Sequence, residues 1–120
     1  MAKQLALEPV WLVSKGNVLC AAMRATTRSD RRRGLLGVSQ VIEPLVLQPC
    51  TWVHTIGIRT ALDVAYVNSE GIVLSMHTLK PWRIGPLIRS AEFIVEAAPG
   101  SFERWNLHVG DVMEIRHVNG

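Results

Sequence analysis

Residues 50–67 of this 120-residue chain are largely apolar, but a histidine, an arginine and an aspartate interrupt them. These residues are His54, Arg59 and Asp63. Charged groups among apolar side chains need partners. The three residues therefore predict either one shared polar pocket or three buried groups that each have a separate hydrogen-bond or charge partner. His54 could be a core imidazole bonded to a carbonyl, or it could open onto a cleft beside Arg59 or Asp63. Arg59 and Asp63 flank a predicted corner, where an ion pair would still leave guanidinium donors for a bound anion.

Positive charge is concentrated in one region. The chain has 13 Lys and Arg against 10 Asp and Glu, a net charge of +3, and five arginines fall at positions 24, 28, 31, 32 and 33. Such a cluster could meet a phosphate, a carboxylate or an acidic neighbour. Consecutive helical residues point about 100° apart, so Arg31, Arg32 and Arg33 are not expected to contact one ligand together. A solvated face with one arginine against the sheet is the alternative.

Trp82 and Arg83 form a second aromatic and basic pair. Pro81 and Pro86 predict that this pair lies in a loop or at a sheet edge. Trp82 could stack on a planar ligand or cover the edge of the core.

The common catalytic signatures are missing from the sequence. It has no Gly-x-Ser-x-Gly motif and no phosphate-binding glycine loop, and no pair of acids stands out. Cys20 and Cys50 lack both metal-ligand spacing and an activating context, and are predicted to be reduced core residues. We therefore expect no metal and no cofactor. A hydrolase with His54 as general base, and Arg59 stabilising negative charge, is one alternative function.

Short apolar runs between Gly, Pro, Asn and Ser predict an all-β sandwich or barrel. The predicted strands are 10–13, 18–25, 45–47, 52–58, 62–67, 72–79, 93–96 and 112–117. Turn residues at 15–17 and 68–71 predict two hairpins. Short helices are expected at 27–36, with Thr27 or Ser29 as N-cap and Gly34 and Gly37 at its end, and at 101–107, with Ser101 as cap.

Length and hydropathy predict one domain over residues 1–120. No segment approaches the roughly 18 apolar residues of a membrane span, and no leader pattern is present, so a cytoplasmic protein is expected. The sequence does not predict an oligomeric state.

Several ordered blocks resemble the bacterial and archaeal family called domain of unknown function 192, or uncharacterised protein family 0127. The resemblance runs from about residue 24 to 111, through Arg-Arg-Arg-Gly-Leu-Leu-Gly at 31–37, Val-His-Thr at 53–55, Gly-Ile-Arg at 57–59, Leu-Asp-Val at 62–64 and Lys-Pro-Trp-Arg at 80–83. It implies a compact, jelly-roll-like β sandwich and no established activity. The family's typical positions correspond to Arg33, Gly34, Leu35, Gly37, His54, Thr55, Arg59, Asp63, Trp82 and Arg83. This chain departs from the family at Ile58, Ala61 and Ala98, and the lack of a proline at Ala61 loosens the expected corner between Arg59 and Asp63.

The sequence thus favours a small binding module for a small anionic or polar ligand. Its predicted site residues are Arg33, His54, Thr55, Arg59, Asp63, Trp82 and Arg83. Weak nucleic-acid binding through residues 24–33 is disfavoured, because basic and aromatic residues do not alternate along any predicted strand. A purely structural or interaction domain is the remaining alternative.

Overall fold

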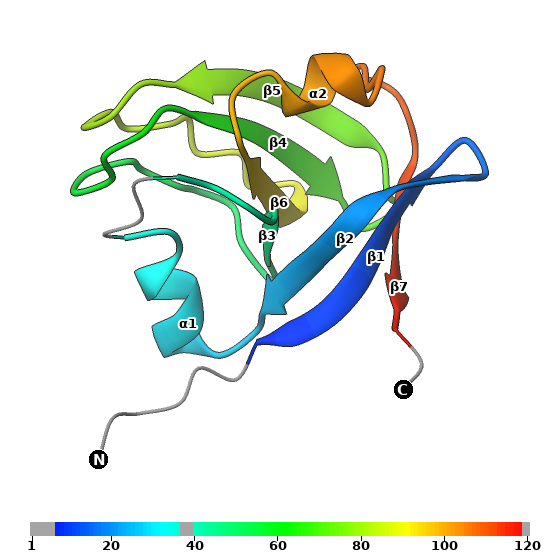
Figure 1. Ribbon diagram of the computed structural model, residues 1–120, viewed down its shortest axis with the longest axis horizontal. Coiled ribbons are helices and arrows are strands. Elements are labelled where there is room, and N and C mark those ends of the chain that lie inside the picture. The colour runs from blue at the N-terminus through cyan, green and yellow to red at the C-terminus, as the bar shows by residue number, and fades with distance from the viewer. Residues whose placement is uncertain (1–6, 37–39, 119–120) are drawn as a thin grey trace.

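Seven strands and two short helices make up the computed structural model, which describes residues 7–36 and 40–118 (Figure 1). In chain order they are β1 (Glu8–Ser14), β2 (Asn17–Ala25), α1 (Arg28–Arg33), β3 (Leu45–Leu47), β4 (Leu62–Asn68), β5 (Val73–Leu79), β6 (Ala91–Ala97), α2 (Ser101–Arg104) and β7 (Met113–His117). The prediction of an all-β fold with short helices is confirmed. Its jelly-roll character stays a prediction, and Gly37 lies outside the described residues.

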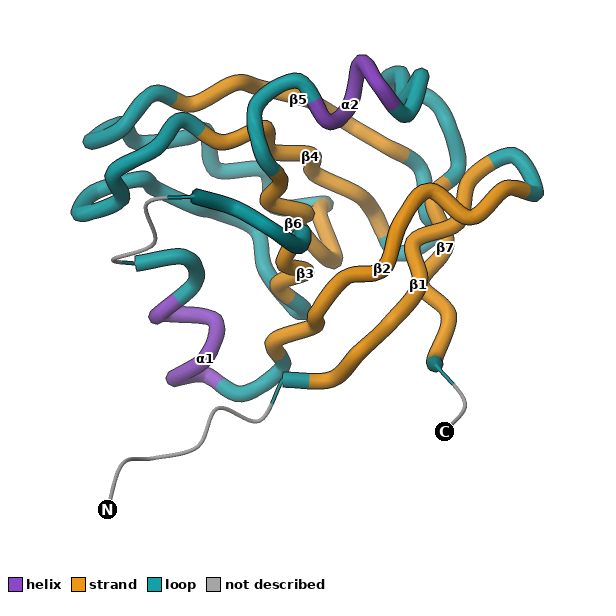
Figure 2. The backbone as a smooth tube through the Cα atoms, viewed as in Figure 1, coloured by secondary structure: helices purple, strands orange, loops and turns teal. Residues whose placement is uncertain are grey.

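The strands form one sheet in the order β5-β4-β6-β3-β2-β1-β7. Neighbouring strands are antiparallel, except that β2 and β3 are parallel. The two edge strands approach each other, because Ile72 before β5 bridges Val112 before β7. Two further backbone bonds join the same segments, from Val73 N to Asp111 O (2.9 Å) and from Met113 N to Gly71 O (2.7 Å). The sheet therefore curls into a barrel-like shape (Figure 2).

Both predicted hairpins form at the residues that turn chemistry favours. Lys15 and Gly16 have φ values of 53° and 76° between β1 and β2, and a two-residue turn with two positive φ angles suits the twist of the strands it joins. Between β4 and β5, the Asn68 side chain accepts hydrogen bonds from the backbone N–H groups of Glu70 and Ile72.

The central strands are buried on both faces, because alternating side chains enter two separate hydrophobic clusters. Val46, Ala65 and Val95 belong to a cluster that also contains Phe102 of α2. Leu45, Tyr66 and Ile94 belong to the other cluster, with Val53 and Ile58. The connection between β3 and β4, residues 48–61, therefore covers the second face of the sheet.

The predicted strand over residues 52–58 is wrong: this segment is a loop with one isolated bridge, between His54 and Ile84. Its backbone bonds go to the loop between β5 and β6, from Thr55 N to Arg83 O (2.8 Å) and from Gly85 N to Val53 O (3.0 Å). A turn closed by a bond from Ile58 N to Thr55 O, with Gly57 at a φ of 81°, bends the chain away from a strand path. The expected alternation of side chains across 52–59 consequently does not apply.

Both helices begin where a side-chain oxygen meets their free N–H groups. Thr27 caps α1 by accepting from Asp30 N (3.2 Å), as one of the two predicted caps. Ser101, the cap expected for the second helix, is instead the first residue of α2. The Asp63 carboxylate of β4 takes its place, accepting from Gly100 N (3.0 Å) and Phe102 N (3.3 Å). Neither helix of the described chain has the length and apolar character that a membrane crossing requires.

Candidate functional site

A pocket of about 480 Å³ lies between α1, the 48–61 loop and the sheet, and we call it the α1 pocket. Its basic lining comes from α1, through Arg28, Arg31, Arg32 and Arg33. His54 and Trp52 line it from the loop, Leu47 and Ile58 supply apolar wall, and Glu96 lines it from β6.

Three of the arginines share one helical face, because Arg28, Arg31 and Arg32 are spaced i, i+3 and i+4. Arg28, Arg32 and Arg33 are exposed, whereas Arg31 is half-buried and donates to the carbonyl of Thr26. In the described part of the chain, none of the four forms an ion pair. The pocket borders all four arginines, and the expectation that Arg31, Arg32 and Arg33 do not contact one ligand together stays a prediction.

His54 is half-buried and its ring packs against Trp52, with ring centroids 5.3 Å apart. Its Nδ1 lies 3.2 Å from the backbone nitrogen of Ile56, which donates to it. An imidazole that accepts at Nδ1 carries its hydrogen on Nε2 when neutral. In this tautomer Nε2 of His54 is a hydrogen-bond donor.

Glu96 is an acidic residue in the middle of the sheet, between β3 and β4. It is 2% exposed, and its Oε1 has no hydrogen-bond partner within the described residues. Burial raises the pKa of this carboxyl to about 7. A buried oxygen without a partner is costly, and here it belongs to a residue that lines the pocket.

Two further titratable groups lie near Glu96, on neighbouring elements. Burial raises the pKa of the Cys50 thiol, and its Sγ donates to the Trp52 carbonyl (3.2 Å). Burial also raises the pKa of Tyr66 to about 12, and its hydroxyl donates to the carbonyl of Pro86 (2.7 Å). Because nucleophilic cysteines need a lowered pKa, Cys50 is suited to lining the pocket and not to attack on a substrate. Cys20 and Cys50 are both free thiols.

Of the seven predicted site residues, Arg33 and His54 line the α1 pocket together. Thr55, next to His54, is fully buried. Its hydroxyl donates to Lys80 O (2.6 Å) and accepts from Arg83 N (2.8 Å). Thr55 thus joins the two loops and holds His54 in place.

Arg59, Trp82 and Arg83 do not line this pocket. Trp82 is 65% exposed with a φ of 61°. The Arg83 guanidinium lies 3.4 Å from Pro81 O, within its own loop. Arg59 is exposed, and no ion pair joins it to Asp63 within residues 7–36 and 40–118.

Asp63 lies in a different place from His54, on the face of the sheet that α2 covers. It is 5% exposed and accepts from the Thr78 hydroxyl (2.9 Å) as well as from the start of α2. Across the residues that the structure describes, no three His, Cys, Asp or Glu side chains are grouped to hold a metal ion.

Glu96 is not among the predicted site residues, although the sequence carries a signal for it. Glu96 interrupts an apolar run, Phe-Ile-Val-Glu-Ala at 93–97, just as His54 interrupts its own. The same expectation about buried charge applied to both. The i, i+3, i+4 spacing of Arg28, Arg31 and Arg32 was also readable from the sequence.

Two solved structures share the fold. A candidate transcription regulator from Sinorhizobium meliloti has a TM-score of 0.76 and 18% identity over 96% of this chain and 98% of its own. A protein of unknown function from Novosphingobium aromaticivorans has a TM-score of 0.71 and 17% identity over 90% of this chain and 84% of its own. At these identities the likeness shows the fold alone.

Two curated relatives match part of the sequence. UPF0127 proteins of Pyrococcus furiosus and Pyrococcus abyssi are 40% and 31% identical over 62 residues, 52% of this chain and 53% of each relative. The chain thus spans about half the length of the curated relatives it matches. The model of the DUF192 family, described as Uncharacterized ACR, matches residues 10–115. The chain therefore belongs to the DUF192 family.

Proposed function

We propose that this protein is a binding module that takes a small anionic ligand in the α1 pocket. The observation that carries the proposal is the pocket lining, which contains four arginines and His54. Guanidinium groups offer several N–H donors in a planar fork, which suits carboxylates and phosphates. A volume of about 480 Å³ lies within the usual range for small-molecule sites.

The charge balance of the lining favours an anion. The lining contains four arginines and one acidic residue, Glu96, whose carboxyl burial keeps partly protonated near neutral pH. Positive charges gathered in a partly enclosed site raise the local concentration of anions. His54 adds a donor at Nε2, because Nδ1 already accepts from Ile56 N.

Hydrolysis with His54 as the base has less support, because the nitrogen that would take a proton is already bonded to the backbone. The other predicted partners also favour simple binding. Arg59 does not line the pocket, and Asp63 is bonded to the start of α2.

The test is a titration with inorganic phosphate and with acetate at low ionic strength, in which NMR spectra record the amide chemical shifts. We expect saturable shifts confined to α1 and residues 50–58. The double variant Arg32→Gln/Arg33→Gln should weaken phosphate binding about tenfold, because each lost guanidinium removes charge-assisted hydrogen bonds.

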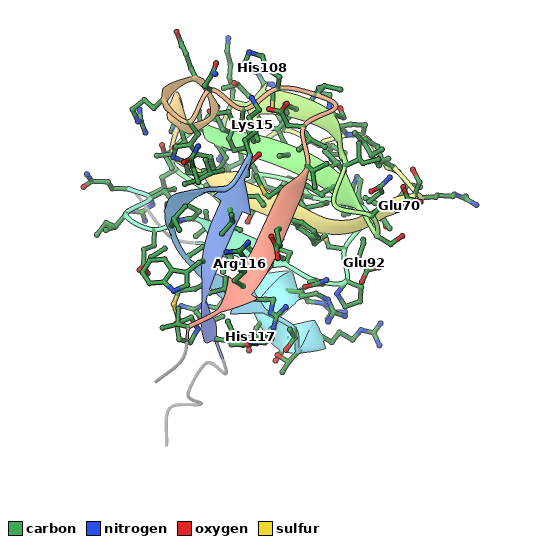
Figure 3. The ribbon with its side chains drawn as sticks, turned by 90° about the vertical axis from the view of Figure 1, so that its right-hand side faces the viewer. Lys15, Glu70, Glu92, His108, Arg116 and His117 are labelled. Carbon is green, nitrogen blue, oxygen red and sulfur yellow. The ribbon has the colours of Figure 1, made fainter. Side chains whose placement is uncertain are left out.

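The matched control is Lys15→Gln/Arg116→Gln, which likewise removes two positive charges, one at the turn between β1 and β2 and one on the edge strand β7 (Figure 3). Neither residue lines the α1 pocket. Arg116 is exposed and paired with Glu114 (3.0 Å). Equal weakening by the control would reduce the effect to net charge and reject the proposal. Tight binding of duplex DNA through the same arginines, with no response to phosphate, would replace it with nucleic-acid binding.

A further inference from the structure

The buried acid on β6 offers a hydrogen-bond acceptor that the protein leaves unused. Oε1 of Glu96 has no partner in the described part of the chain, and the residue is 2% exposed. Glu96 lies opposite Leu45 of β3 and Val64 of β4, so the central sheet fixes its position. Folded proteins pair nearly all such buried groups, and exceptions need an explanation.

The unused oxygen lies under the backbone at the end of α1. A Cβ atom built on Gly34 would be 3.4 Å from Glu96 Oε1, and Gly34 and Glu96 both line the α1 pocket. With no side chain at position 34, this glycine leaves space beside the oxygen. Because the arginines are exposed or half-buried and Glu96 is buried, Glu96 lies at the floor of the pocket and the arginines lie at its rim.

Building on the anion-binding function proposed above, we propose that the ligand is a hydroxylated anion whose hydroxyl donates to Glu96 Oε1 while its charged group contacts the arginines of α1. A sugar phosphate and a sugar acid share this chemistry. The ligand supplies the hydrogen bond that the protein lacks, and the rim supplies the charge that holds the other end.

A hydroxyl suits the floor better than an ammonium group. Four guanidiniums line the pocket, and each would repel a second cation brought beneath them. A hydroxyl is neutral and avoids this repulsion. It can also donate to Glu96 in either protonation state, and a carboxyl with a pKa of about 7 populates both states near neutral pH.

The test compares six-carbon compounds that differ in one respect each, using calorimetry on the full chain. Gluconate and hexanoate differ in their hydroxyls, sorbitol 6-phosphate and hexyl phosphate form the matched phosphate pair, and 6-aminohexanoate carries an ammonium instead. We expect at least one hydroxylated compound to bind about tenfold more tightly than its deoxy partner, the effect of one good hydrogen bond. The stronger pair identifies the anionic group as carboxylate or phosphate.

Two variants assign the effect to Glu96. Glu96→Met removes the acceptor with similar volume and should abolish the preference for hydroxyls without weakening hexanoate. Glu96→Gln keeps a carbonyl oxygen and should retain part of the preference. The comparison of compounds on the unaltered protein is informative even if a variant does not fold.

The outcomes separate this inference from the proposed function. If hexanoate and hexyl phosphate bind as well as their hydroxylated partners, and Arg32→Gln/Arg33→Gln weakens them, the anion site stands and the hydroxyl inference is wrong. Tightest binding by 6-aminohexanoate also rejects it. Absence of binding by every compound rejects both.

Discussion

Glu96 shows how one residue can decide the character of a site. Its carboxyl is surrounded by the second hydrophobic cluster, whose members include Ile94 beside it on β6 and Val64 across from it on β4. Water cannot stabilise its charge there, so burial raises its pKa to about 7. Ionising this carboxyl in the folded protein therefore costs free energy that the unfolded chain does not spend.

This cost predicts a pH dependence of stability. The folded pKa of Glu96 is about 7 and its ordinary value is 4.5, so the folded state binds the proton more tightly. The contribution of Glu96 to the free energy of unfolding is then greatest below pH 4.5, falls as pH rises towards 7, and is constant above that. From pH 5 to pH 8 the loss amounts to about 2–3 kcal/mol.

Urea denaturation of the protein and of Glu96→Gln, at about pH 5 and about pH 8, measures the contribution of Glu96 to the free energy of unfolding. The variant must be compared directly, because Glu8 and Glu114 titrate in the opposite sense: hydrogen bonds from Arg24 and Arg116 lower the pKa values of their carboxyls. Between pH 5 and pH 8, the free energy of unfolding of Glu96→Gln should rise by about 2–3 kcal/mol relative to that of the unaltered protein. A difference that does not change with pH would contradict a buried, raised-pKa carboxyl.

At the scale of elements, polar side chains on strands and loops hold the short pieces together. Thr55 joins the 48–61 loop to the loop between β5 and β6, and Asp63 joins β4 to α2. A four-residue helix has too few internal bonds to form alone. The carboxylate of Asp63 therefore determines where α2 begins.

Asp63→Ala tests this role. It leaves the N–H groups of Gly100 and Phe102 without their acceptor, and we expect the free energy of unfolding to fall by about 2–4 kcal/mol, since these are bonds to a buried charge. The affinity of phosphate for the α1 pocket should not change in the folded protein. Glu70→Ala, at an exposed turn, is the control and should alter neither property. Loss of phosphate binding without loss of stability would instead place Asp63 in the ligand site.

The whole molecule depends on the contact between its edge strands. The bridge between Ile72 and Val112 closes the curled sheet, and Gly71 lies against the backbone at this closure. Closing a sheet protects edge strands that could otherwise pair with other chains. The closure joins residues about forty positions apart, so its strength depends on the complete fold.

Gly71→Ala should weaken this closure. A Cβ at Gly71 would lie 2.7 Å from Met113 O, a backbone atom that cannot move aside alone, and the φ of Gly71 is 85°. Gly16→Ala is the matched control, because its φ is 76° but nothing lies within 4 Å of the added carbon. Gly16→Ala should lower the free energy of unfolding by about 1 kcal/mol through backbone strain. Gly71→Ala should lower it by more.

Hydrogen exchange separates the two effects. The amides of Val73 and Met113, which bond across the closure, should exchange faster in Gly71→Ala and not in Gly16→Ala. Equal destabilisation by both variants, with both amides still protected, would show that the closure tolerates the extra carbon.

The sequence by itself determined most of the strands, both hairpin turns and the start of the first helix near Thr27, because these depend on alternation and turn chemistry within a few residues. Seven of eight predicted strand segments overlap strands of the structure, and the exception, 52–58, contains the loop that carries His54. Only the tertiary structure decided which polar residues meet. It brings Glu96 and His54 to the pocket of the α1 arginines, and takes Asp63 to the start of α2 on the other face of the sheet. The reason is physical: side-chain spacing reports the face a residue occupies, whereas partners far apart in sequence are set by how the sheet curls and which loops cover it.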